Sequence, residues 1–144
     1  MIYSLIHEYS DAPKKNCKWS HEFAIEDEYV LMVYVYKNKK RLLKGIADRV
    51  AIYDFLDAGG LFFSHFVEGV EFPFAFPHPI PFAEIHLNFE RIGGGYVAHE
   101  FMHLIQVWMR TKKEMDNEEY APELMGRLTS EFWGWYLEQD ESNG

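Results

Sequence analysis

The distribution of hydrophobic residues along the chain predicts up to four strands. Residues 29–36 form an unbroken apolar run of β-branched and aromatic side chains, which is typical of a strand buried on both faces. Residues 83–90 place polar side chains at every second position, which indicates a half-exposed strand at the edge of a sheet. Residues 2–7 and 61–64 are shorter apolar segments that can add further strands. We therefore expect a short mixed sheet.

Three other segments repeat apolar residues at intervals of three and four, which is the period of an amphipathic helix. These are residues 40–57, which end at a Gly-Gly stop, a segment that follows the glycine turn at residues 93–95 and runs to residue 110 or 113, and residues 118–138. The polar residues 139–144 are expected to fray. Together with the strands, these helices predict a small α+β domain spanning residues 1–144, with an edge strand beside the second helix.

Two further segments lack a regular pattern. Residues 11–18 are polar and turn-like. Residues 72–82 alternate proline with aromatic and other residues, which predicts an extended segment and argues against a central strand or a helix. We expect this second segment either to cover the core with its phenylalanines or to form a wall beside a substrate groove.

Composition limits the class of protein. Hydrophobic residues make up 48% of the chain and aromatic residues 17%, which excludes a disordered chain. The net charge is −9 without a basic stripe, so nucleic-acid binding is not expected. The one basic cluster, residues 37–44, is interrupted by leucines, as on the solvent side of a helix.

Cys17 is the single cysteine, which favours a reducing compartment. No signal-peptide pattern and no apolar run of membrane-spanning length is present, so we expect a cytoplasmic protein without membrane contact.

The motif His-Glu-x-x-His occurs at His99, Glu100 and His103, within the predicted helix after the glycine turn. Histidines four residues apart share a helix face, with Cβ atoms about 5–6 Å apart, so both imidazoles can bind one ion. A zinc ion with three protein ligands keeps one position open for water and lowers the pKa of that water to about 7. Glu100 can then accept the proton of the water as general base. The motif predicts a hydrolytic Zn²⁺ site.

A third protein ligand is expected, because two histidines bind zinc too weakly for a catalytic site. The next acidic residues lie at the start of the last predicted helix and include Glu119 and Glu123. In an antiparallel helix pair, residues equally far from the connection lie level, which puts Glu123 beside His103 if the first helix ends near Trp108. Glu119 and Glu123 share a helix face, so one can bind the metal while the other supports it.

The motif followed by a helix-borne glutamate resembles the gluzincin group of zincin-like zinc metallopeptidases. This resemblance implies a zinc site of two histidines and one glutamate, and the nineteen residues between His103 and Glu123 are a thermolysin-like spacing. Over about residues 83–133 the chain also resembles small phage-encoded metallopeptidases, in which the ligand glutamate precedes Leu-x-Gly-x-Leu-Thr. That resemblance makes Glu119 the preferred third ligand, with Glu123 as the alternative. The matching segments are residues 83–87, 97–103, 119–121 and 124–129.

These observations predict a zinc-dependent metallopeptidase that cleaves a peptide or protein substrate, in a host cytoplasm if the phage resemblance holds. Tyr96 and Arg127 are the first candidates to stabilise the transition state, followed by Tyr120 and His86. The predicted edge strand could pair with an extended peptide. Two alternatives stay open: a non-catalytic phage-type interaction or inhibitor protein with a vestigial metal site, and a protein that uses its metal for structure.

Overall fold

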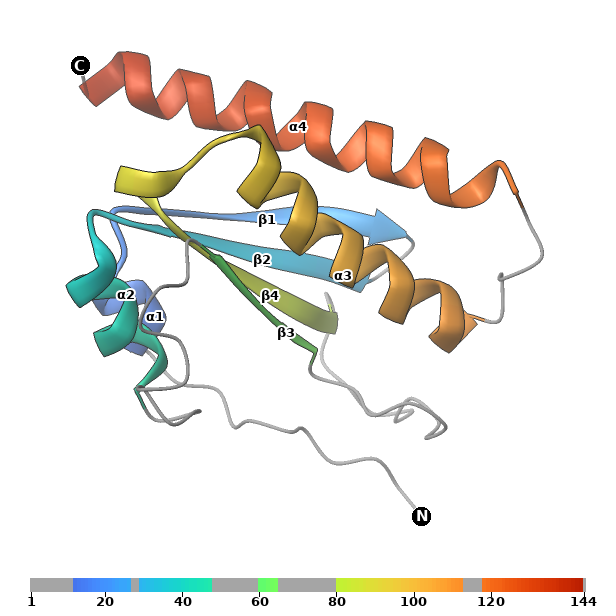
Figure 1. Ribbon diagram of the computed structural model, residues 1–144, viewed down its shortest axis with the longest axis horizontal. Helices are drawn as coiled ribbons and strands as arrows, with labels where there is room; N and C mark the ends of the chain where they lie inside the picture. The colour runs from blue at the N-terminus through green and yellow to red at the C-terminus, as the bar shows by residue number, and fades with distance from the viewer. Residues whose placement is uncertain (1–11, 27–28, 48–59, 65–79, 113–117, 144) are drawn as a thin grey trace.

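The computed structural model describes residues 12–26, 29–47, 60–64, 80–112 and 118–143. Within these ranges, strands and helices combine into an α+β arrangement, which confirms the predicted class (Figure 1). The elements in chain order are α1 (Ala12–Asn16), β1 (Trp19–Glu26), β2 (Tyr29–Tyr36), α2 (Lys39–Ile46), β3 (Gly60–Ser64), β4 (Ile80–Asn88), the 3₁₀ turn η2 (Phe89–Arg91), α3 (Gly94–Lys112) and α4 (Tyr120–Asn143).

The four strands form one mixed sheet in the order β1-β2-β4-β3. β1 is antiparallel to β2, β4 runs parallel to β2, and β3 is antiparallel to β4. Among the described residues, β1 and β3 are therefore the edges of the sheet. Helix α3 contacts the edge strand β3, whereas the edge strand predicted beside this helix is residues 83–90, which form the inner strand β4.

The prediction of burial on both faces holds for one face of the inner strand β2 and in part for the other, where Met32 and Tyr34 are partly exposed. β1 has no clear sequence signal. In β2, the side chains of Leu31, Val33 and Val35 are completely buried. In β1, the buried residues Trp19, Phe23 and Ile25 lie on one face, and His21, which is exposed, occupies the remaining position of that face. His21 stacks on Trp135 of α4 with ring centroids 5.4 Å apart, a contact that no local pattern could indicate.

The prediction of a half-exposed edge strand at residues 83–90 is wrong. β4 lies between β2 and β3, and its polar side chains Glu84, His86 and Asn88 are buried. His86 Nδ1 lies 2.7 Å from the hydroxyl oxygen of Tyr36, and His86 Nε2 lies 2.9 Å from Oε1 of Glu84. Both faces of β4 are therefore buried: one carries apolar side chains and the other carries polar side chains. The polar side chains can be buried because they are hydrogen-bonded.

The proline-rich segment enters the described structure only at its last residues, where β4 begins. Pro81 lies inside this inner strand and pairs with Val30 of β2, next to a shift in register between Val30 and Leu31. A proline fits a sheet at such an irregularity, because its missing N–H donor is not needed there. The expectation that proline excludes a central strand is thus corrected for Pro81.

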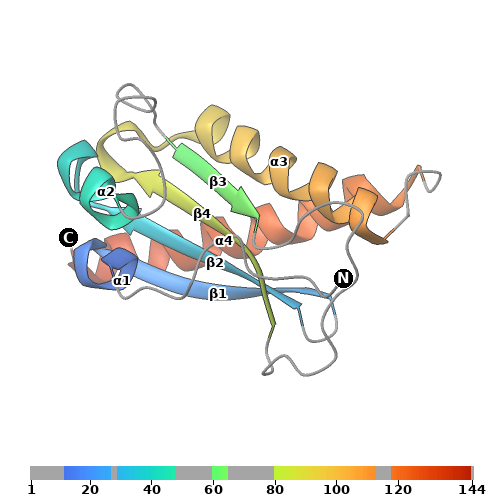
Figure 2. The same ribbon diagram turned by 90° about the horizontal axis from the view of Figure 1, so that it is seen from below.

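Helices α3 and α4 lie on the same face of the sheet (Figures 1 and 2). The predicted repeat of four residues in the last helix is confirmed, since Leu124, Leu128, Phe132 and Tyr136 are all buried. α4 continues to Asn143, so the prediction that this helix stops near residue 138 is wrong. No proline or glycine interrupts residues 137–143, and several of them favour helix. The main core between these helices and the sheet includes Leu31, Val33, Val35, Ile85, Leu87, Phe101, Leu104, Trp108, Leu128 and Phe132.

The short helices α1 and α2 pack against each other at one end of the opposite face of the sheet (Figure 2). The helix predicted over residues 40–57 is confirmed for Lys39–Ile46, and residues 48–59 lie outside the described structure. The turn predicted at residues 11–18 contains the one-turn helix α1. The second buried cluster, at this end of the sheet, consists of Tyr36, Leu42, Ile46 and Leu61.

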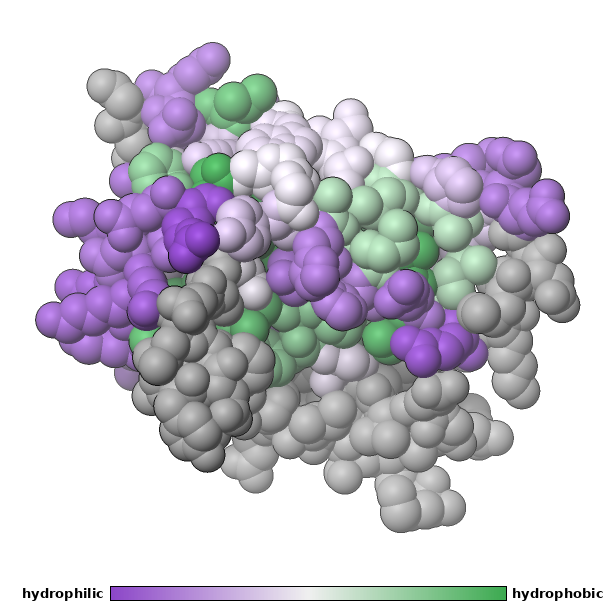
Figure 3. Space-filling view, viewed as in Figure 1, coloured by the Kyte–Doolittle hydropathy of each residue, from purple (hydrophilic) through white to green (hydrophobic). Residues whose placement is uncertain are grey.

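The basic cluster lies on the solvent side of α2, as predicted. Asn38 caps this helix by accepting a hydrogen bond from the backbone N–H of Arg41 at 2.9 Å. Lys40, Arg41 and Lys44 are exposed, and Figure 3 shows a hydrophilic surface over this part of the molecule. The leucines of the same helix turn inward, so the charges belong to the wet face of an amphipathic helix.

No helix in the described ranges is both long and apolar enough to cross a membrane. The strand predicted at residues 2–7 lies outside those ranges.

Candidate metal centre

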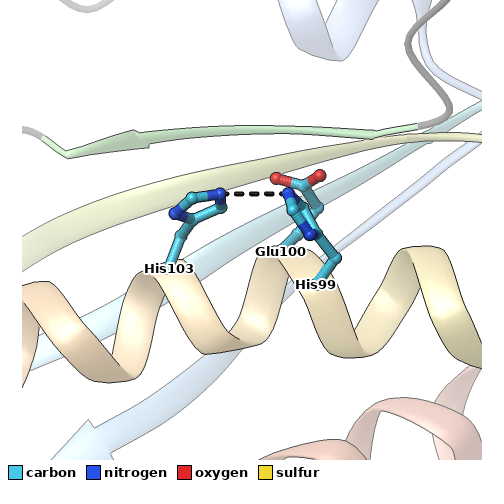
Figure 4. Close-up of side chains that lie close together, drawn as sticks. All are labelled: His99, Glu100 and His103. Carbon is cyan, nitrogen blue, oxygen red and sulfur yellow. Dashed lines mark hydrogen bonds between the residues drawn. The ribbon is translucent and has the colours of Figure 1, made fainter.

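Helix α3 fixes the orientation of both histidines of the motif. Its inward residues Val97, Phe101 and Leu104 are completely buried in the main core. This packing sets the rotation of the helix about its axis. His99 and His103 are exposed on the flank of α3 that faces β3 (Figure 4). The predicted arrangement of two histidines on one exposed helix face is therefore present.

The two imidazole rings converge. His99 Nε2 lies 3.1 Å from His103 Nε2, and the ring centroids are 4.7 Å apart. Two nitrogens bound to one tetrahedral zinc ion at about 2.0–2.1 Å would lie about 3.3–3.4 Å apart, so this pair needs only a small adjustment to share an ion. His103 also stacks on Phe62 of β3 with ring centroids 6.1 Å apart, which holds the ring against the edge strand.

Glu100 completes the cluster from a buried position. One donor atom each from His99, Glu100 and His103 lie within 4.8 Å of one another. Only 5% of Glu100 is exposed, and this burial raises the pKa of its carboxyl group, while the neighbouring His99 acts in the opposite direction. A carboxylate with a raised pKa is a better proton acceptor at neutral pH than an ordinary surface glutamate. The donor set of two imidazoles and a carboxylate fits zinc.

The Glu100 side chain lies against Gly60, the first residue of β3. A Cβ atom at residue 60 would come within 3.0 Å of Glu100 Cγ and 3.4 Å of Glu100 Oε2. Real Cβ atoms rarely approach another atom so closely, so the absent side chain makes room for the carboxylate. The sequence does not reveal this role, because the adjacent glycines 59 and 60 are explained equally well as a helix stop.

The structure does not bring Glu119 or Glu123 to the histidines. Glu119 lies in the turn before α4 and Glu123 in its first turn, and both are exposed. In Figure 4, α4 passes on the opposite side of α3 from the imidazole rings. Glu123 instead lines a pocket of about 290 Å³ with Glu26 and Arg127. Within the described part of the chain, Glu100 is the one acidic residue gathered with the two histidines.

The proposed transition-state stabilisers occupy different places. Arg127 donates hydrogen bonds to the carbonyl oxygens of Ala24, at 2.9 Å, and Ile25, so it anchors β1 to α4. The hydroxyl group of Tyr120 receives a hydrogen bond from the indole N–H of Trp108 at 2.8 Å. Only Tyr96 lies close to the histidines along α3, one turn before His99.

His86 faces away from the metal motif. It belongs to the hydrogen-bonded group with Tyr36 and Glu84, and its ring stacks on Tyr34 with centroids 5.0 Å apart. These residues lie on the face of the sheet opposite α3, because the neighbouring β4 residues Ile85 and Leu87 point into the main core. His86 is therefore a buried structural histidine in this arrangement.

Arg91 is a neighbour of Tyr96 that sequence reasoning does not identify. Its Nη2 donates a hydrogen bond to the Tyr96 hydroxyl at 2.8 Å, and its guanidinium carbon lies 5.5 Å from the centre of the Tyr96 ring. The two residues are separated by the turn between η2 and α3, so no helical spacing could have paired them.

Comparison of the chain with protein-family models, with curated proteins and with solved structures finds no match.

Proposed function

We propose that the chain is a zinc-dependent metallopeptidase in which His99 and His103 bind the metal and Glu100 is the general base. The observation that carries this proposal is the convergence of the two Nε2 atoms, 3.1 Å apart, beside a buried carboxylate. The order of the residues on α3, the adjacent edge strand β3 and the resemblance of the motif to gluzincins support the same conclusion.

The residues of the chain have distinct roles in this proposal. When bound, zinc supplies Lewis-acid chemistry that polarises a carbonyl group and acidifies water. Glu100 accepts a proton from the attacking water at its carboxylate, and its raised pKa suits this task. The same carboxyl group can then deliver the proton to the departing amine nitrogen. The buried face of Glu100 against Gly60 keeps its carboxylate in one position.

One set of variants tests both the metal site and the role of Glu100. In excess zinc, the wild type should bind about one ion per chain, and this binding should weaken in His99→Ala and in His103→Ala. Glu119→Gln and Glu123→Gln should keep their zinc, because α4 lies on the other side of α3. Loss of zinc from either glutamine variant would show that the glutamate replaced in it is the third ligand.

The variant Glu100→Gln distinguishes a catalytic site, in which Glu100 is the general base, from a non-catalytic site, in which Glu100 is a metal ligand. As general base, Glu100 is not needed for binding, so this variant should keep zinc and lose hydrolysis of peptides in a host-cell lysate by a factor of about 10² or more. The second candidate function is a non-catalytic metal site in which Glu100 is itself a ligand, which the grouping of its oxygen with both imidazoles favours. In that case Glu100→Gln would lose zinc, and the wild type would cleave no peptide.

A further inference from the structure

Arg91 and Tyr96 form a polar pair at the end of α3 that lies nearest to His99. Tyr96 precedes His99 by three residues, so the two side chains share a face of the helix about one turn apart. Side chains of a helix lean toward its N-terminus, and Arg91 meets the Tyr96 hydroxyl from the preceding turn η2. The pair therefore lies on the histidine face of α3, about one helical turn before His99. This is roughly the length of one residue of an extended peptide.

The donors of this pair are largely unused. An arginine has five N–H donors, and Arg91 contributes one of them, at 2.8 Å, to Tyr96. Within the described ranges, Arg91 makes no ion pair with a carboxylate. The Tyr96 hydroxyl accepts that hydrogen bond, and in the same ranges its own O–H has no acceptor. Remaining N–H and O–H donors therefore meet at one point on the surface.

The surroundings leave this point open to a ligand. Tyr96 is 37% exposed, and Arg91 is exposed as well. A Cβ atom added at Gly94 or Gly95 would meet no atom within 4 Å, so no described side chain packs against α3 at these two residues, between Arg91 and Tyr96 in the chain. The first turn of α3 contains no acidic residue. A positive group with spare donors in a chain of net charge −9 selects a ligand that is negative and accepts hydrogen bonds.

We infer that Arg91 and Tyr96 recognise a carboxylate group of the substrate beside the bond at the metal centre. Arg91 supplies the charge and further N–H donors, and Tyr96 orients the guanidinium through the hydrogen bond and the contact with its ring. Both are specificity-determining residues and do not touch the reacting atoms. This inference rests on the proposed peptidase function, because a peptide offers a carboxylate either at its C-terminus or on an Asp or Glu side chain.

Peptide binding tests the inference without requiring catalysis. Three probes are titrated into the full-length Glu100→Gln protein, in the presence of zinc and separately in EDTA: acetyl-Ala-Ala-Ala as the free acid, the same peptide as the C-terminal amide, and acetyl-Ala-Asp-Ala amide. The readouts are the dissociation constant and the NMR shift of the Arg91 Nε–H group. We expect a carboxylate peptide to bind about tenfold more tightly than the uncharged amide. Tighter binding of the free acid identifies the C-terminus as the source, and tighter binding of the Asp peptide identifies a side chain.

Further substitutions in the Glu100→Gln protein test whether Arg91 and Tyr96 cause the preference for carboxylate peptides. Arg91→Ala should abolish it, Arg91→Lys should keep part of it, and Tyr96→Phe should reduce it. Arg41→Ala is the matched control, since it removes an exposed arginine from α2 and should leave the preference unchanged. Equal binding of all three peptides, or an unchanged preference in Arg91→Ala, would overturn the inference. A stronger NMR response to inorganic phosphate than to the peptides would also overturn it. If the preference is present and wild type cleaves no peptide, the proposed function fails while the recognition site stands.

Discussion

At the scale of single residues, Glu100 is held where its neutral form is favoured. Burial beside β3 raises the pKa of its carboxyl group, and His99 compensates for this only in part. A raised pKa brings a general base closer to the pH at which it must work. The same burial costs the folded chain stability whenever the carboxyl group is ionised. Catalytic suitability and stability therefore oppose each other at this position.

Glu100→Gln should make the metal-free chain more stable at pH 7. The folded carboxyl group binds its proton more tightly than the unfolded one, whose ordinary pKa is 4.5. The bound proton therefore contributes to the stability of the folded chain, and this contribution is complete below pH 4.5. That contribution is lost as the pH rises through the folded pKa, whereas an amide does not titrate. Urea unfolding in EDTA at pH 4 and pH 7 should show an advantage of the variant at pH 7 that largely disappears at pH 4. An equal difference at both values would contradict the assigned burial effect.

Gly60→Ala should impair catalysis without removing the metal. The added methyl group would come within 3.0 Å of Glu100 Cγ and of Leu87 Cδ2, and the carboxylate would have to move. The neighbouring atoms have to give by a few tenths of an ångström. Because displacing a catalytic group by about 1 Å costs up to about 10²-fold in rate, we expect a smaller loss of several-fold, up to about tenfold, in kcat. Zinc content should stay at the wild-type level. Metal analysis together with a peptidase assay checks both statements.

Gly134→Ala in α4 is the matched control for that substitution. A Cβ atom at residue 134 would meet no atom within 4 Å, and the residue lies inside a helix. Alanine there should raise the free energy of unfolding by about 0.5–1 kcal/mol and leave activity unchanged. Equal activity of both alanine variants would show that Gly60 does not position Glu100.

At the scale of helices and strands, local periodicity predicts what depends on local contacts. The histidine pair of α3 is separated by one helical turn, so its convergence follows from the sequence spacing. The burial of β2 follows similarly from its apolar run. The position of β4 does not follow from its sequence. Glu84 and His86 give the strand the alternating pattern of an exposed edge, but they are buried because they form a hydrogen bond with each other.

The separation of Glu119 and Glu123 from the two histidines could not be predicted for a related reason. Spacing in an antiparallel helix pair determines which residues of α4 lie level with His103, and it does not determine on which side of α3 the second helix packs. The tertiary core places α4 against Phe101 and Trp108, on the side away from the imidazole rings. Glu119 and Glu123 therefore end up apart from the histidines although their distance along the helix suits the expectation.

Arg127→Ala should weaken the contact between α4 and β1. Its guanidinium donates to the carbonyl oxygens of Ala24 and Ile25 near the end of an edge strand. Hydrogen bonds from a charged donor contribute about 1.5–3 kcal/mol, so urea unfolding should show a loss of about that size. Zinc content and activity should not change, whereas a transition-state stabiliser would lower kcat.

Glu131→Gln is the control for Arg127. It removes only the exposed ion pair between Arg127 and Glu131, 3.2 Å apart with both side chains 43% exposed. Exposed pairs of this spacing contribute little, about 0.3–0.5 kcal/mol. A loss in Glu131→Gln as large as that in Arg127→Ala would assign the effect to the ion pair and not to the strand carbonyl groups.

At the scale of the whole molecule, the metal centre and the core are separate. The main core consists of apolar side chains of the sheet, α3 and α4, and it includes neither His99 nor His103. Both histidines are exposed, and His103 adds a ring contact with the partly buried Phe62 of β3. The chain should therefore be folded without metal, which distinguishes the proposed enzyme from a protein whose zinc replaces a core.

Removal of zinc should abolish peptide hydrolysis and leave the chain folded. In EDTA the far-UV circular dichroism spectrum should match that of the zinc-loaded chain, because the core does not need the ion. Zinc should still raise the unfolding temperature, since an ion that binds only the folded state stabilises it by about 2.7 kcal/mol at a concentration a hundred times its Kd. His99→Ala and His103→Ala should be as folded as the metal-free wild type, and neither should respond to zinc. Collapse of the secondary structure in EDTA would instead show that the metal holds the fold together, and the exposed position of the two imidazoles makes that outcome the sharpest test of the proposed function.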